Sequence, residues 1–237
     1  MSKKPADSLV AALGGIQWSG NVATFVQKPN ETERLAERNM RLAIWSRQIE
    51  QAEKGNPALG FVREMQVSGQ LVTALTALAL YKPAAAAIRT TIETALYYSY
   101  FRRHPVELQT LIRTSSFYIS KSEVIEYHKT HTASFKSLQA HLGLLQRLEE
   151  SYSSLSAIVH GQVPGTWSHH SLKATAPSLS LEAEVIQAFE GAEDVVHRLF
   201  LCTLAQECWS DFSAAAKASL LKGLSADTRT HLALDAA

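Results

Sequence analysis

Two polar pairs in the sequence have the residue types and spacing of groups that move protons or bind anions. Arg89 and Glu93 stand four residues apart in the segment AIRTTIETALYYSYF, and Ser156 and His160 stand four residues apart in the later segment YSSLSAIVHGQ. A histidine can take or give a proton near neutral pH, and an arginine can stabilise negative charge. These four are the candidate catalytic residues, provided that the fold brings the two segments together.

The first pair lies on a predicted helix whose apolar residues share one face. On a wheel of about 100° per residue that starts at Ile88, these residues fill an arc from roughly 0° to 120°. Arg89 falls at about 100°, inside this arc, and Glu93 falls at about 140°, at its edge. We therefore expect both side chains to be mostly buried and paired. Glu93→Ala should then cost roughly 3 to 5 kcal/mol, because it would leave a buried arginine without a partner.

The second pair lies at the end of another predicted helix. Glu149, Ser153, Ser156 and His160 follow one another at helical spacing and form a polar row beside an apolar face. If this helix packs on the helix of Arg89, the two pairs can share one cleft. Alternatives without chemistry stay open: the ion pair could only fix the packing register, and His160 could only cap its helix.

Turn and cap residues divide the chain into helices. The sequence predicts long helices at about 31–54, 58–81, 83–104 and 144–159, a shorter one at about 106–118, and another that begins after the capping box Ser120-x-x-Glu123. The first long helix should be capped by Asn30 with Glu33. Residues 161–180 are rich in Ser, Thr and Pro and predict a surface loop, followed by a long helix from 181 towards 221, continuous or interrupted by a break.

Strand patterns are nearly absent, so the predicted fold class is all-α. Helices of this length joined by mostly short turns favour a single-domain bundle of four to six main helices. A chain of 237 residues is long enough to bury one sizeable core. We expect a lead segment at 1–29, the helical bundle domain at 30–223 and a tail at 224–237.

Composition narrows the possible partners and compartments. The formal net charge is only +1, so no global field attracts nucleic acid or membrane. Cys202 and Cys208 are six residues apart on one predicted helix and are expected to be reduced core thiols. The apolar stretch 9–13 is too short for a signal peptide, and no run of roughly 18 apolar residues follows. These features predict a cytoplasmic protein without membrane contact.

No cofactor motif stands out. The chain has no GxGxxG, no Walker lysine, no HExxH and no CxxC. Five of its histidines invite a metal interpretation, but carboxylates at matching offsets are missing; these are His128, His131, His141, His169 and His170. Ser156 followed by His160 has no nucleophile elbow around it, which argues against a serine hydrolase. We therefore expect neither a metal nor a cofactor.

The two helical segments together resemble the HEPN superfamily of bacterial helical domains. The resemblance rests on the R-x-x-x-E pattern at Arg89 and Glu93, followed by LS-x-x-x-H ending at His160, and it covers roughly residues 60–162. Active members of that superfamily place an arginine four to six residues before the histidine. Here the nearest arginine upstream of His160 is Arg147, thirteen residues away, so the ribonuclease motif itself is absent.

The resemblance implies nucleic-acid-related work in a bacterial defence or toxin–antitoxin type system. In that case His160 would be the family's histidine and Glu93 its acidic partner, and the activity would be metal-independent RNA cleavage. The missing arginine spacing favours the alternative, a non-catalytic helical module that binds a protein partner or a nucleotide. The resemblance also implies a homodimer, and the long apolar segment 58–81 has more apolar surface than one core needs.

Overall fold

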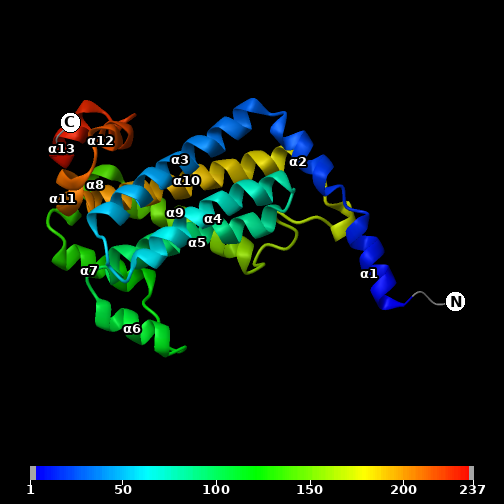
Figure 1. Ribbon diagram of the computed structural model, residues 1–237, viewed down its shortest axis with the longest axis horizontal. Helices are drawn as coiled ribbons and strands as arrows, with labels where there is room; N and C mark the ends of the chain where they lie inside the picture. The colour runs from blue at the N-terminus through cyan, green and yellow to red at the C-terminus, as the bar shows by residue number, and fades with distance from the viewer. Residues whose placement is uncertain (1–3, 235–237) are drawn as a thin grey trace.

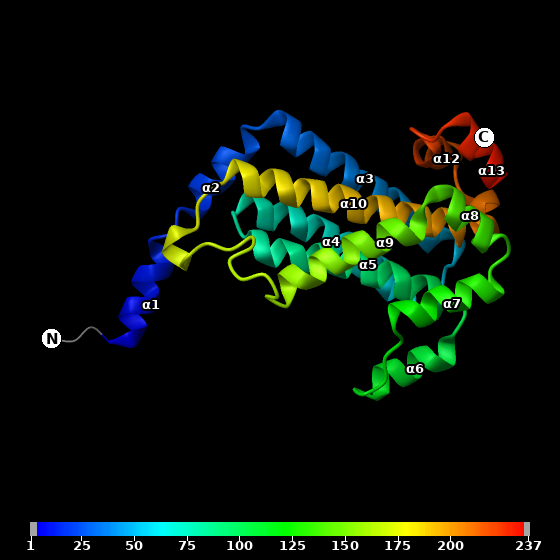
Figure 2. The same ribbon diagram turned by 180° about the vertical axis from the view of Figure 1, so that it is seen from behind.

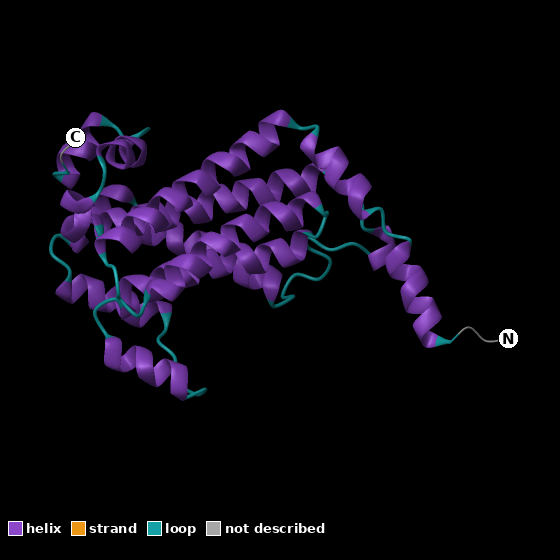
Figure 3. Cartoon of the chain, viewed as in Figure 1, coloured by secondary structure: helices purple, strands orange, loops and turns teal. Residues whose placement is uncertain are grey.

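Five long helices form the body of the molecule in the computed structural model (Figure 1). They are α3 (Pro29–Ala52), α4 (Leu59–Ala77), α5 (Tyr81–Phe101), α9 (Leu144–Val159) and α10 (Leu179–Cys202). The structure describes residues 4–234, except for the side chain of residue 172, and this range holds no strand (Figure 3). The described chain is thus an all-α single domain, as the sequence predicts.

α5 lies at the centre of the bundle and packs against α4, α9 and α10. Its alanines and isoleucines make this possible, since small side chains let neighbouring helices approach and Ile88 and Ile92 fill the core with no exposed surface. Gly69 likewise lets α4 approach α3 closely. A β-carbon at position 69 would lie 2.7 Å from Cδ1 of Leu42 on α3, so any other residue there would force the Leu42 side chain to shift.

Some predicted helix ends are confirmed and others are wrong: the helix predicted at 58–81 ends at Ala77, the next begins at Tyr81 and not at Pro83, and the helix predicted at 106–118 ends at Arg113. α9 has the predicted bounds with His160 as its C-terminal cap, and the capping box of Ser120 and Glu123 opens α7 (Lys121–His131). Asn30 is not a cap, because α3 already begins at Pro29. A proline suits the first helical position, where its missing N–H would have no partner in any case.

The helix expected to run from 181 towards 221 ends at Cys202, and the chain beyond it forms short helices. After α10 the chain forms α11 (Ala205–Cys208), a 3₁₀ turn at Trp209–Asp211, α12 (Ala214–Leu221) and, within the predicted tail, α13 (Ala226–Leu232). Both cysteines are buried and free. Burial raises the pKa of Cys202 to about 12 and that of Cys208 to about 11, so both stay protonated thiols. Two further short helices, α6 (Pro105–Arg113) and α8 (Phe135–Leu142), lie between α5 and α9 in the chain.

The predicted lead segment is itself helical. α1 (Pro5–Gly14) projects away from the bundle, while α2 (Trp18–Val26) lies against it (Figure 1). α2 places Phe25 in the core, whereas α1 has no buried residue. Pro5–Val26 spans 22 residues with a mean hydropathy of 1.2, and only 17% of its most apolar part is buried in the protein. By length and composition alone, this stretch could cross a membrane. Polar residues are scattered through this stretch, so it contains no long uninterrupted apolar run.

Candidate functional site

The packing of α5 against α9 brings the two predicted polar pairs to one side of the bundle (Figure 2). Arg89 and Glu93 come from the middle of α5, where the flanking residues Ile88 and Ile92 are fully buried. His160 follows the last residue of α9 and is exposed. The expectation that these helices pack together is therefore confirmed.

The guanidinium of Arg89 is the hub of the site. Its Nε donates to Oε1 of Glu93 at 3.0 Å, and its Nη2 donates to the hydroxyl of Tyr152 at 2.9 Å. Its Nη1 lies 2.8 Å from Nε2 of His160. Tyr152 closes the network by donating its own hydroxyl proton to Glu93 at 2.8 Å. Arginine, carboxylate, phenol and imidazole thus form one connected cluster that joins α5 to the end of α9.

The contact with Arg89 also defines the tautomer of His160. Arginine has only donors, so Nε2 of His160 must offer its lone pair, and the proton of the neutral ring lies on Nδ1. The basic nitrogen consequently faces the guanidinium and the solvent edge. A substrate hydroxyl that replaced Arg89 at Nε2 would find a proton acceptor with a cation beside it.

The pair is more open than the helical wheel predicts. The Arg89 side chain is 19% exposed, but that of Glu93 is 35% exposed. Glu93→Ala would therefore leave an arginine that water can reach, and the expected cost falls from the 3 to 5 kcal/mol of a buried pair to about 1 kcal/mol. The wheel fails here because α9 covers only part of this face of α5.

Hydrogen bonds and neighbouring charges shift the pKa values of Arg89 and Tyr152. Burial lowers the pKa of Arg89, but the bond to Tyr152 and the charge of Glu93 outweigh it, so the net pKa is raised. Burial and the acceptor Glu93 raise the pKa of Tyr152 above its ordinary value, against the opposing effect of Arg89. Near neutral pH Arg89 is therefore a fixed cation and Tyr152 a neutral phenol.

Ser156 does not join the network. Its Oγ is buried and has no hydrogen-bond partner, so this hydroxyl forms no hydrogen bond with the His160 ring. A serine nucleophile needs its hydroxyl bonded to a base. The role of Ser156 as a catalytic residue is therefore not supported by the geometry, although it lies on the same helix one turn before His160.

Two residues of the site were not singled out from the sequence. The spacing of Tyr152 places it on the apolar face of its helix, yet its hydroxyl binds both Arg89 and Glu93. Lys121 opens α7, lies over the ring of Tyr152 at 4.8 Å from its centre, and forms an ion pair with Glu149. Tyr152 precedes Ser156 by one helical turn, and this spacing was the only available signal. Nothing in the sequence places Lys121 here.

Two cavities flank the cluster. One, with a volume of ≈ 390 Å³, is lined by Arg89, Glu93, Tyr152 and Lys121 together with residues 118–120. The other, with a volume of ≈ 510 Å³, lies at the C-terminal end of α9 and includes Val159, the last residue of that helix, in its lining. The polar cluster thus stands between two hollows of ligand size.

The histidines with a metal interpretation are scattered. His128 is buried and bonded to Ser99 and Thr132, while His169 contacts the carbonyl oxygen of Ala79. Within residues 4–234 no three His, Cys, Asp or Glu side chains converge as a metal site would require. His128 and His169 instead have structural partners.

Comparison with known proteins adds no identification. No protein-family model, no curated protein and no solved structure matches the chain. Any function must therefore be argued from the site itself.

Proposed function

We propose that this protein is a HEPN-like helical domain with nucleic-acid-related work in a bacterial defence or toxin–antitoxin type system, and that it cleaves RNA without a metal. The observation that supports this is the 2.8 Å contact between Nη1 of Arg89 and Nε2 of His160. The arginine that the sequence lacks just before His160 has a spatial counterpart on α5. An exposed imidazole beside a fixed cation suits phosphoryl transfer.

In the proposed reaction a ribose 2′-hydroxyl binds His160 in place of Nη1 of Arg89. Nε2 takes the hydroxyl proton as the 2′-oxygen attacks the adjacent phosphorus, and the bond from phosphorus to the 5′-oxygen breaks. The products are a 2′,3′-cyclic phosphate and a 5′-hydroxyl that takes its proton from water. Nη1 of Arg89 donates to the phosphate oxygens from its present position, because Nε and Nη2 hold the rigid guanidinium on Glu93 and Tyr152.

The test is cleavage of single-stranded RNA in the presence of a chelator, followed as cyclic-phosphate product. His160→Ala should lower the rate by about 100-fold or more, the usual contribution of a general base. His131→Ala is the matched control, because His131 is also an exposed histidine in the last turn of its helix. A wild-type protein without activity, or equal rates for both variants, would contradict the proposal.

A second function, a non-catalytic module that binds a protein partner or a nucleotide, is favoured by one observation. The cations of the site are already compensated, Arg89 by Glu93 and Lys121 by Glu149. Such a balanced site attracts a polyanion weakly and suits recognition through hydrogen bonds. Arg89→Glu should then abolish binding of the protein partner or nucleotide, while the protein stays folded. Normal binding by this variant would remove the site from this function.

The proposal also covers the oligomeric state of the protein and its cellular compartment. We propose a cytoplasmic homodimer, because α4 exposes Val67 by 55% and Leu71 by 47% on a helix that otherwise serves the core. Light scattering should give twice the monomer mass at micromolar concentration, and Leu71→Glu should shift it towards the monomer. A monomer mass over a wide concentration range would exclude the dimer.

A further inference from the structure

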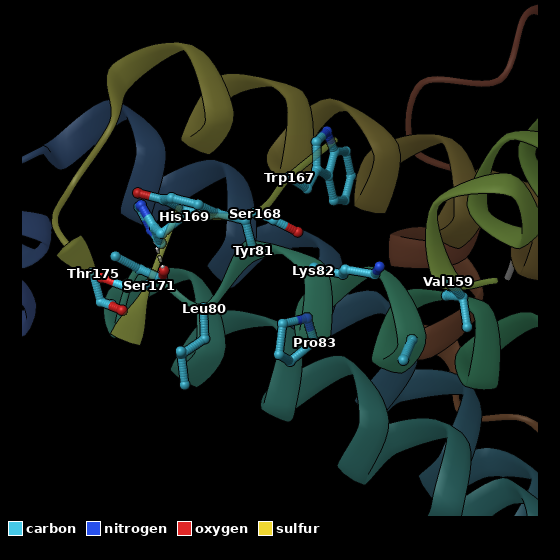
Figure 4. Close-up of a pocket in the computed structure, with 12 residues that line it drawn as sticks. Leu80, Tyr81, Lys82, Pro83, Val159, Trp167, Ser168, His169, Ser171 and Thr175 are labelled. Carbon is cyan, nitrogen blue, oxygen red and sulfur yellow. Dashed lines mark hydrogen bonds between the residues drawn. The ribbon is translucent and has the colours of Figure 1, made fainter. Parts of the chain in front are cut away.

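The larger cavity beside His160 is built by three segments. The first turn of α5 supplies Tyr81, Lys82 and Pro83, α9 supplies Val159, and the connection to α10 supplies Trp167 (Figure 4). Its ≈ 510 Å³ lie within the range of small-ligand pockets. Apart from Lys82, the walls at these positions are apolar or aromatic. The cavity therefore has room and surface for a flat organic group.

Lys82 gives the cavity its charge. It is half-buried, and within the described chain it forms neither an ion pair nor a hydrogen bond. Its side chain extends towards Val159, the last residue of α9 (Figure 4). A β-carbon at Gly161 would lie 3.7 Å from the Lys82 Nζ, so the ammonium stands beside the residue that follows His160. Unlike Arg89 and Lys121, this cation has no compensating carboxylate.

The walls are held in unusual backbone conformations. Four non-glycine residues have a positive φ in the described chain, and two of them, Ala79 (φ 59°) and Trp167 (φ 55°), line this cavity. Both are tied down: the Trp167 indole donates to Glu184 at 2.8 Å, and His169 contacts the Ala79 carbonyl at 3.0 Å. Strained backbone that neighbouring groups hold in place is frequent at ligand sites.

We propose that this cavity is a nucleotide subsite of the RNA site, with the base against its apolar walls and the phosphate on Lys82. This inference rests on the proposed function and deepens it, since it names the group that the protein holds next to His160. Flat bases bind apolar and aromatic walls whatever their sequence, and an unpaired ammonium is a point contact for phosphate. The nucleotide held here would lie next to the bond cleaved at His160.

The first test is titration calorimetry of the full chain with AMP, GMP, CMP and UMP. At least one should bind with a Kd of roughly 1 mM or tighter. Lys82→Met, which keeps the apolar stem, should weaken that binding at least tenfold. Lys136→Met on α8 is the control, because Lys136 is exposed and lies outside this cavity. Adenosine and inorganic phosphate, used as separate probes, should each bind less tightly than AMP.

A second variant tests the cavity without removing a charge. Ala86 is exposed and lines the hollow, so Ala86→Trp should fill it and abolish nucleotide binding while circular dichroism stays unchanged. Nucleotide binding that survives both Lys82→Met and Ala86→Trp would overturn the subsite, as would no binding of any nucleotide at 5 mM, a concentration well above the roughly 1 mM expected.

The subsite and the cleavage can fail separately. His160→Ala should abolish cleavage and leave nucleotide binding intact, since His160 does not line the cavity. A wild-type protein that binds nucleotides through Lys82 but cleaves no RNA would overturn the proposed reaction and keep the subsite. Cleavage that is unaffected by both cavity variants would overturn the subsite and keep the reaction.

Discussion

Two clusters in this protein each contain an arginine, a glutamate, an aromatic donor and a histidine. In the interior, Arg41 of α3 binds Glu193 of α10, and one turn further along Trp45 donates its indole N–H to Nδ1 of His197 at 3.0 Å. At the solvent edge, the same four kinds of group meet around Arg89. Residue types and helical spacing are similar, but the surroundings differ.

Burial separates the two clusters. Glu193, Trp45 and His197 are at most 1% exposed. Burial, with Arg41 and other arginines nearby, lowers the pKa of His197 well below its ordinary value, so this ring stays neutral and exchanges no proton with a substrate. His160 is exposed, and its basic nitrogen meets only Arg89. Solvent access, more than the set of residues, therefore distinguishes a candidate functional site from a cluster that only stabilises helix packing.

The largest effect should come from breaking the interior cluster. Glu193→Ala would remove the fully buried partner of Arg41 and leave a cavity in its place, so the free energy of unfolding should fall by about 3 to 5 kcal/mol. Glu93→Ala at the solvent edge should cost only about 1 kcal/mol. Urea denaturation of both variants measures the difference. Equal losses would contradict the contrast between the clusters.

Acid should destabilise the protein through its interior histidines. Burial lowers the pKa of His128 to about 4. In the unfolded chain it returns to about 6.5, so between these values the unfolded state binds more protons. The stabilising contribution is complete above about pH 6.5 and is lost as the pH falls towards 4, amounting to about 2 kcal/mol between pH 7 and pH 5.

His197 acts in the same direction, because its pKa is lowered too. His197→Gln keeps an acceptor for Trp45 but cannot be protonated, so it should flatten the loss of stability between pH 7 and pH 5. Denaturant melts at several pH values provide the measurement. A variant with the full wild-type pH dependence would show that His197 is not held neutral.

Tyr152→Phe should have a smaller effect. It removes the hydroxyl that accepts from Arg89 and donates to Glu93, in a half-exposed setting, so the cost should be about 1 kcal/mol. RNA cleavage should fall at the same time, because Arg89 loses one of the bonds that orient it. Lower stability with unchanged cleavage would make Tyr152 a packing residue only.

The smallest change in stability is expected for His160→Ala. Its side chain is exposed and only one contact is lost, so the free energy of unfolding should stay within about 0.5 kcal/mol of wild type. His197→Ala is the interior counterpart and should cost about 3 kcal/mol, since it opens a cavity and leaves the Trp45 N–H unpaired. Thermal melts of the two variants compare them directly.

The sequence predicts helices well where caps and prolines mark them. The bounds of α9, the capping box of α7 and the meeting of Arg89 with Glu93 follow from local patterns. The interior cluster was missed because Arg41 and Glu193 are 152 residues apart and look like ordinary charges of helix surfaces. The openness of Glu93 was missed for a related reason: a helical wheel gives the direction of a side chain and not how far a neighbouring helix extends.

Buried residues of the N-terminal segment tie its apolar stretch to the bundle. A membrane span formed by Pro5–Val26 would require Ile16, Asn21 and Phe25, each at most 6% exposed, to leave the bundle. Extracting Phe25 alone would forfeit about 1.5 to 3 kcal/mol of apolar burial. α1 by itself has ten residues and reaches about 15 Å, half the thickness of a bilayer core. Completion of the bundle therefore competes directly with insertion of this segment.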